Sequence, residues 1–196
     1  MNKISKYLIL LGLILITLSL TLYIKNKYDE FNTGKTSSEI LNIIEDKINN
    51  DNDNDNDNDN NSSSLVVNIS GNDYIGVINI PSINIKLPIM SKTDYDKLAI
   101  SPCRYYGDII TNDLVICAHD YDNQFGKIVS LKEDDIIIIT DISGNNYIYE
   151  VVLTEELKPT EVTSMIESSF DLTLYTCTYG ALKRITVRCN RVYDYV

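Results

Sequence analysis

The sequence predicts a mainly β protein: a closed barrel of short strands with a few short helices, preceded by one transmembrane helix. From residue 74 onward, short runs rich in Ile, Val, Tyr and Thr alternate with polar turns, and few segments are long enough for a helix. Seven or eight such strands fit into about 120 residues, and closing them into a barrel removes exposed sheet edges. The first third of the 196-residue chain is composed differently and is not expected to contribute to this core.

Residues 1–24 are predicted to be a membrane anchor. The stretch from Tyr7 to Ile24 is apolar apart from hydroxyl-bearing Thr and Ser, and as a helix it would rise roughly 27 Å, close to the thickness of a bilayer core. Lys3 and Lys6 precede it, and no small-residue cleavage site follows before Lys25, which favours an uncleaved signal anchor over a removable signal peptide. We therefore expect a single-pass protein of the cell membrane, anchored through residues 7–24, with its folded part outside the cell.

Residues 25–72 are predicted to be a polar, low-complexity tether. Their centre, residues 51–60, consists of five Asp-Asn repeats. Such a self-repelling tract stays extended and would hold the folded part on the order of 40 Å from the membrane. The alternative is a calcium loop, but the tract lacks the Gly at the sixth position and the Glu at the twelfth that such loops require. Ser38, followed by apolar residues from Ile40 to Ile48, predicts a short capped helix, which would be only marginally stable in isolation.

Charge and cysteine content exclude several classes of function. The formal net charge is −11, to which the repeat tract contributes five charges, so the folded domain is modestly acidic. Nucleic acid is not an expected partner, because phosphate binding needs clustered Lys and Arg. The cysteines at 103, 117 and 189 are expected to be small buried hydrophobes. The alternative is that the four cysteines form two disulfides, which an extracellular location would permit. Their spacing matches no metal signature, and neither a metal nor a cofactor is expected.

Each strand of the barrel is predicted from a β-branched or aromatic run bounded by turn residues. The predicted strands are 74–80, 83–90, 113–118, 135–140, 147–154, 171–177 and 184–192. The fourth and fifth flank the turn at 143–146 and read as a hairpin. One or two helical turns are predicted at 93–100, a short helix at 125–131 and a helix at 160–168, the last with Thr160 as its cap.

The last two strands place two reactive groups opposite each other. If residues 178–183 connect an antiparallel hairpin, Cys177 lies directly across from Arg184. Arg188 would instead pair with Thr173, farther along the strands, and Arg191 has the wrong parity. Side chains two apart share a face, so the leucines at 172 and 174 face the core, and Cys177 and Arg184 share the opposite, polar face.

A cysteine, a histidine and an arginine in this arrangement predict acyl transfer through a thiol. Cys177 is useful as a nucleophile only as a thiolate, so a base must assist. His119, the only histidine, follows an apolar strand and can exchange that proton, while Arg184 can stabilise an oxyanion. Taken singly, each residue fits a structural role better: a buried thiol, a surface imidazole and a surface ion pair. Their combination favours catalysis.

The same residues carry a resemblance to a known family. The run from Thr173 to Cys177 matches the TLxTC motif of sortases, and Arg184 resembles the terminal arginine of that family. Residues 75–89 are similar to the opening strands of sortases, and residues 112–119 to the strand and loop that carry the catalytic histidine. Ala118 and Asp120 depart from the common family residues, so the class stays open, with a B- or D-like form expected.

The resemblance implies an eight-stranded barrel over residues 73–196 that acts as a cysteine transpeptidase. Such an enzyme cleaves surface proteins at an LPxTG-like sorting signal, forms a thioester on Cys177, and transfers the acyl group to an amine of a peptidoglycan precursor or a pilin. His119 would be the acid and base, and Arg184 would orient substrate or stabilise the oxyanion. Thr176 would contribute to the oxyanion hole.

Three alternative functions are weighed against this prediction. A papain-like cysteine peptidase would hydrolyse the thioester, but its nucleophile precedes its histidine along the chain. An L,D-transpeptidase would carry a short His-Gly-Cys-x-Arg cluster, and this sequence lacks one. The non-enzymatic alternative is an inactive barrel that serves as a membrane-tethered binding module.

Overall fold

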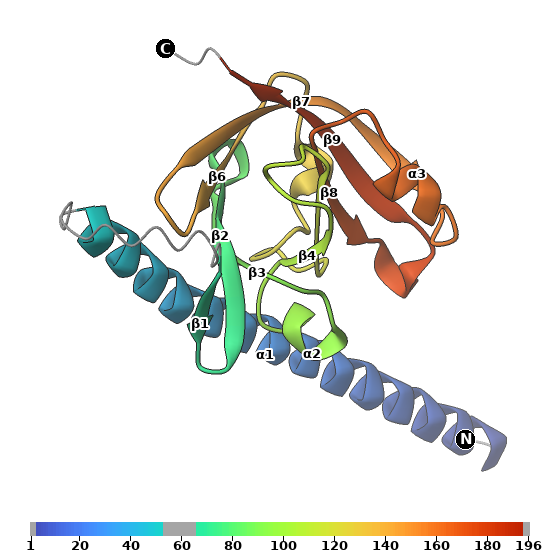
Figure 1. Ribbon diagram of the computed structural model, residues 1–196. Coiled ribbons are helices and arrows are strands. Elements are labelled where there is room, and N and C mark those ends of the chain that lie inside the picture. Colours follow the sequence, from blue (N-terminus) through green and yellow to red (C-terminus); the bar gives the residue numbers. More distant parts are fainter. Residues whose placement is uncertain (1–2, 53–65, 194–196) are drawn as a thin grey trace.

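The strands form one sheet that closes into a barrel, as seen in the computed structural model, which describes residues 3–52 and 66–193 (Figure 1). Eight strands form the ring, in the order β2-β3-β4-β5-β8-β9-β7-β6, and the pairing of β2 with β6 closes it. A ninth strand, β1 (Val67–Ile69), pairs only with β2. The ring strands are β2 (Asn72–Ile80), β3 (Ile85–Met90), β4 (Cys103–Tyr106), β5 (Leu114–Ala118), β6 (Ile136–Asp141), β7 (Asn146–Leu157), β8 (Leu172–Cys177) and β9 (Arg184–Val192). The predicted closed barrel is confirmed.

All seven predicted strands are present, and β1 and β4 were missed. The predicted hairpin is β6 and β7, paired from Ile136↔Glu150 to Thr140↔Asn146. β4 escaped prediction because it has only four residues and carries Arg at its second position. It joins β3 through a single parallel pair, Met90↔Cys103.

The described connections between the strands contain only short helices: α2 (Tyr95–Leu98), α3 (Val162–Ile166) and 3-10 turns at Pro81–Ile83, Ile128–Ser130 and Tyr179–Ala181. The helix predicted over 125–131 is therefore wrong beyond a single 3-10 turn. Thr160 is not the cap of α3, because Glu161 occupies that position and makes no side-chain cap bond. Its carboxylate accepts a hydrogen bond from the main-chain N–H of Lys158 instead, at 2.7 Å.

The barrel wall is buried on both faces over much of its surface. Inward residues such as Ile116, Leu174 and Val187 form the main core. A second cluster lies outside the barrel, where Val115 and Tyr175 pack with side chains of the N-terminal helix and α3. The face of β8 predicted to be polar is therefore largely covered, with Thr173 and Tyr175 both buried.

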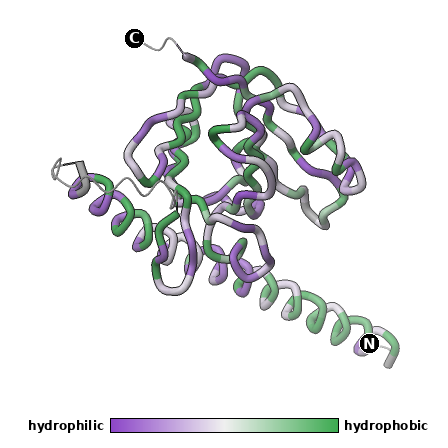
Figure 2. The backbone as a smooth tube through the Cα atoms, viewed as in Figure 1, coloured by the Kyte–Doolittle hydropathy of each residue, from purple (hydrophilic) through white to green (hydrophobic). Residues whose placement is uncertain are grey.

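One long helix, α1 (Lys3–Asn52), includes the predicted membrane-spanning segment and continues through much of the predicted tether. Its N-terminal part is largely hydrophobic (Figure 2), and it is long and apolar enough to cross a membrane. From Glu30 onward one face docks on the barrel, with buried residues three or four positions apart at 30, 33, 37, 40, 44 and 48. Residues 25–52 are thus helical, with one face packed on the barrel from Glu30 to Ile48, and do not form an extended tether. Residues 53–65 of the repeat tract and its flank lie outside the described residues.

Ser38 does not begin a helix, as the sequence predicted. It lies inside α1, and its hydroxyl donates to the main-chain oxygen of Gly34 at 2.8 Å. The docked part of α1 contacts β2 and β3 along the side of the barrel, and its N-terminal part projects beyond the barrel (Figure 1).

Candidate active site

Strand register brings His119 and Cys177 to the same end of two neighbouring strands. β5 and β8 are parallel and paired from Leu114↔Leu172 to Ala118↔Thr176. His119 is the next residue after β5, and Cys177 is the last residue of β8. Residues far apart along the chain thus become neighbours because both strands end in the same place.

Arg184 lies on the other side of Cys177. β8 and β9 are antiparallel, and Cys177 and Arg184 are direct register partners, as the sequence predicted. The guanidinium donates to the main-chain oxygen of Pro159 at 3.0 Å and lies 5.3 Å from the centre of the Tyr175 ring. Its Nε is buried and has no hydrogen-bond partner among the residues that the structure describes. A buried donor without an acceptor is costly, so this group is available for an incoming oxygen.

Arg188 has a structural role. It pairs with Thr173, as predicted, and its guanidinium is buried beneath α3. It donates to the Thr173 hydroxyl at 2.9 Å, to the Glu155 carboxylate at 2.8 Å and to the main-chain oxygen of Ser164 at 2.6 Å. These bonds tie α3 to β7, β8 and β9 of the barrel and leave Arg184 as the arginine beside Cys177.

Exposure separates Cys177 from the other cysteines. All four thiols are free, and only Cys177 is exposed. Burial raises the pKa of Cys103, Cys117 and Cys189, which makes their thiolates rare at neutral pH. The three behave as small buried hydrophobes, as predicted.

His119 is half-buried, and this burial lowers its pKa below the usual 6.5. The imidazole is therefore mostly neutral at pH 7 and can accept a proton. Its ring lies 5.1 Å from that of Tyr121, and its main-chain N–H donates to Oε1 of Gln124 at 2.9 Å. His119 also lines a cavity of about 370 Å³ between α1 and α2, together with Tyr95 and Tyr121.

Thr176 uses its hydroxyl within the fold. The side chain is buried and donates to the main-chain oxygen of Ala118 at 2.9 Å, which ties the end of β8 to the end of β5. This hydroxyl has no second proton to offer an oxyanion. The bond instead aligns the two strand ends from which His119 and Cys177 emerge.

The contacts that α1 makes with the loop after His119 were not predicted from the sequence. Glu30 of α1 accepts a hydrogen bond from the main-chain N–H of Asp122, and its own main-chain oxygen accepts one from the Asn123 amide. A lone Glu in a polar segment carries no signal for such a role. Within residues 3–52 and 66–193, no group of three or more His, Cys, Asp or Glu side chains is arranged to hold a metal ion.

Comparisons with known proteins identify the family of this chain. A family model described as "Sortase domain" matches residues 78–192. Sortase C1 from Streptococcus agalactiae is 29% identical with a TM-score of 0.57, over 68% of this chain and 74% of that one. Clostridium perfringens sortase C, solved with the C-terminal cell wall sorting motif, is 29% identical with a TM-score of 0.56, over 80% and 91%.

A third similar structure is sortase A from Corynebacterium diphtheriae, at 28% identity and a TM-score of 0.55, covering 63% of each chain. No curated protein sequence matches this chain.

Proposed function

Because this chain belongs to the sortase family, we propose that it is a membrane-anchored cysteine transpeptidase that cleaves surface proteins at an LPxTG-like sorting signal. The acyl group then passes to an amine of a peptidoglycan precursor or a pilin. The observation that supports this most is the strand register, which places the main chain of His119 and of Arg184 on either side of the exposed Cys177. The B- or D-like class stays a prediction.

The first half of the proposed reaction forms a thioester. The Cys177 thiol passes its proton to the neutral imidazole of His119, and the sulfur attacks the scissile carbonyl carbon. The electron pair of the carbonyl moves to its oxygen, where Arg184 donates hydrogen bonds. When the oxyanion collapses, the C–N bond breaks and His119 returns the proton to the leaving amine.

The second half reverses these steps with a new amine. The acceptor amine loses a proton to His119 and attacks the thioester carbon, and the thiolate leaves and regains the proton. The product is an amide between the cargo and the acceptor, with Cys177 restored. A candidate membrane span at the N-terminus would keep the enzyme at the membrane, with the barrel on the outer side.

The test compares transfer with hydrolysis. The full chain in detergent micelles is incubated with an LPxTG-type peptide, with and without an amine acceptor, and products are separated by mass. We expect faster cleavage with the amine and an amide product containing it. Equal rates and a free carboxyl product would show a hydrolase, and no cleavage by wild type or the Cys177→Ala variant would favour a binding module.

A further inference from the structure

The loop that follows His119 is folded back on itself by main-chain hydrogen bonds. The N–H of Phe125 donates to the oxygen of His119 at 3.1 Å, and the N–H groups of Gln124 and Gly126 both donate to the oxygen of Tyr121 at 2.9 Å. Gln124 is fully buried, and its Oε1 accepts the N–H of His119 at 2.9 Å. The position of His119 therefore depends on the position of residues 121–125.

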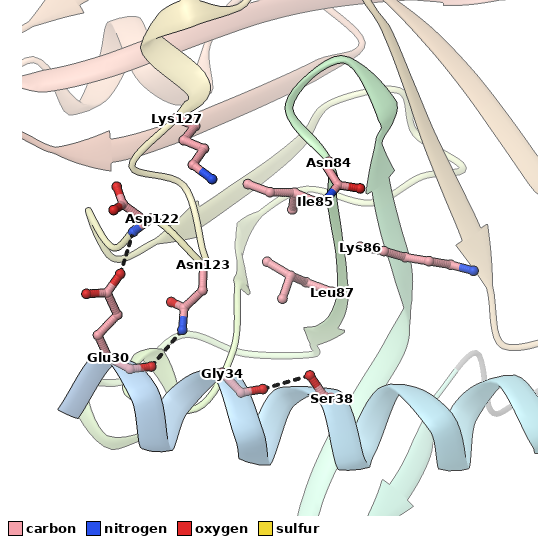
Figure 3. A pocket seen from close by; sticks show the side chains of 10 residues that line it. All are labelled: Glu30, Gly34, Ser38, Asn84, Ile85, Lys86, Leu87, Asp122, Asn123 and Lys127. Carbon is pink, nitrogen blue, oxygen red and sulfur yellow. Dashed lines mark hydrogen bonds between the residues drawn. The ribbon is translucent and has the colours of Figure 1, made fainter. Parts of the chain in front are cut away.

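Helix α1 holds this loop from outside the barrel. Oε1 of Glu30 accepts the main-chain N–H of Asp122 at 3.0 Å, and the main-chain oxygen of Glu30 accepts Nδ2 of Asn123 at 2.6 Å (Figure 3). The Glu30 side chain is 12% exposed and forms an ion pair with Lys27 at 2.7 Å. A hydrogen bond from a main-chain N–H to a buried carboxylate is stronger than one between neutral groups. Helix α1 therefore holds the loop at two adjacent residues, Asp122 and Asn123.

Gly34 permits this close approach. It lies one turn after Glu30, and a Cβ added there would be 2.5 Å from Nδ2 of Asn123 (Figure 3). The clash would fall on the end of a flexible side chain, so the amide would have to leave its place. Alanine at 34 would thus disturb the loop while improving the helix, since Ala favours helix over Gly.

We propose that Glu30 is a positioning residue that acts on His119 through the loop 121–125, so that the anchor helix forms part of the catalytic apparatus. This inference rests on the proposed role of His119. Glu30 lies six residues after Ile24, or about 9 Å along the helix axis, so the loop sits close to the end of the predicted span. The helix that anchors the chain also sets the orientation of its acid and base.

The test uses the full chain in detergent micelles, labelled with ¹³C-histidine. Because the sequence contains one histidine, the imidazole resonance reports His119 alone. We expect Glu30→Ala to shift or broaden this resonance and to lower kcat by about tenfold or more with little change in KM, since small displacements of catalytic groups are costly. Glu30→Gln keeps the acceptor oxygen and should stay within about threefold of wild type.

Two further variants separate positioning from stability. Gly34→Ala should lower kcat and shift the resonance without lowering the unfolding temperature. Glu45 lies on the same helix as Glu30, away from the loop, and forms an ion pair with Lys86 of β3. The control variant Glu45→Ala removes this ion pair and should leave kcat and the resonance unchanged. The proposal is overturned if the resonance in Glu30→Ala and Gly34→Ala matches wild type, or if Glu45→Ala has the same effect as Glu30→Ala.

The resonance also keeps this inference apart from the proposed function. If the wild type forms no amide product but the resonance changes as expected, the transpeptidase assignment fails and the coupling of α1 to His119 stands. If wild type is active and the resonance is indifferent to Glu30 and Gly34, only the coupling fails.

Discussion

At the scale of the residue, two arginines of β9 have different roles because their surroundings differ. Arg184 and Arg188 lie on the same strand and the same face, yet Arg188 is enclosed by acceptors, whereas the buried Nε–H of Arg184 has no acceptor in the described part of the chain. Strand parity predicted which arginine faces Cys177. The partners of Arg188 come from α3 and β7, and the sequence could not reveal which acceptors would meet there.

Alkylation should discriminate among the cysteines. We expect iodoacetamide to modify native protein once, at Cys177, because the other three thiols are buried and burial raises their pKa. Peptide mapping by mass spectrometry identifies the modified residue. The Cys177→Ala variant should stay unmodified while folded and react at three sites after denaturation; labelling of Cys117 in the native protein would contradict this.

The pH dependence of His119 follows from its burial. We expect a pKa below 6.5 in an NMR titration of the single histidine, because desolvation disfavours the imidazolium. The unfolded chain binds this proton at higher pH than the folded one, so this residue costs stability as pH falls below about 6.5. A titration midpoint above 6.5 would show that a charged partner, and not burial, controls the imidazole.

At the scale of the element, α1 departs most from what the sequence predicted. The spacing of Ile40, Ile44 and Ile48 is visible in the sequence and does indicate an amphipathic helix. Isolated, such a segment is marginal, and its stability comes from packing on Val77 and Met90 in the outer cluster of the barrel. That surface belongs to strands far along the chain, so the docked helix could not be predicted from its own residues.

Neighbouring isoleucines provide a matched test of this docking. Ile44 is fully buried and Ile43 is 50% exposed. We expect Ile44→Ala to lower the free energy of unfolding by about 2–5 kcal/mol, as for other buried large-to-small changes, and Ile43→Ala to change it by less than about 0.5 kcal/mol. Chemical denaturation of the full chain in micelles measures both. Equal effects would mean that α1 is not docked as described.

At the scale of the whole molecule, the closed ring places the ends of β5 and β8 and the start of β9 in one region, and α1 contacts the loop that follows β5. The sequence predicted the barrel, seven of its strands and the pairing of Cys177 with Arg184, because all of these follow from local periodicity and hairpin register. The parallel pairing of β5 with β8 is a long-range contact, so the sequence did not predict it. β4 was missed because it is too short to be recognised alone.

The most direct test of the central claim is to trap the acyl-enzyme. The full chain is mixed with an LPxTG-type peptide without an amine acceptor, quenched in acid and examined by intact-mass and peptide mass spectrometry. The account predicts an added acyl mass on Cys177 that disappears when an amine is supplied and never forms in Cys177→Ala. Cleavage of the peptide by the Cys177→Ala variant, or an acyl group on another residue, would contradict it.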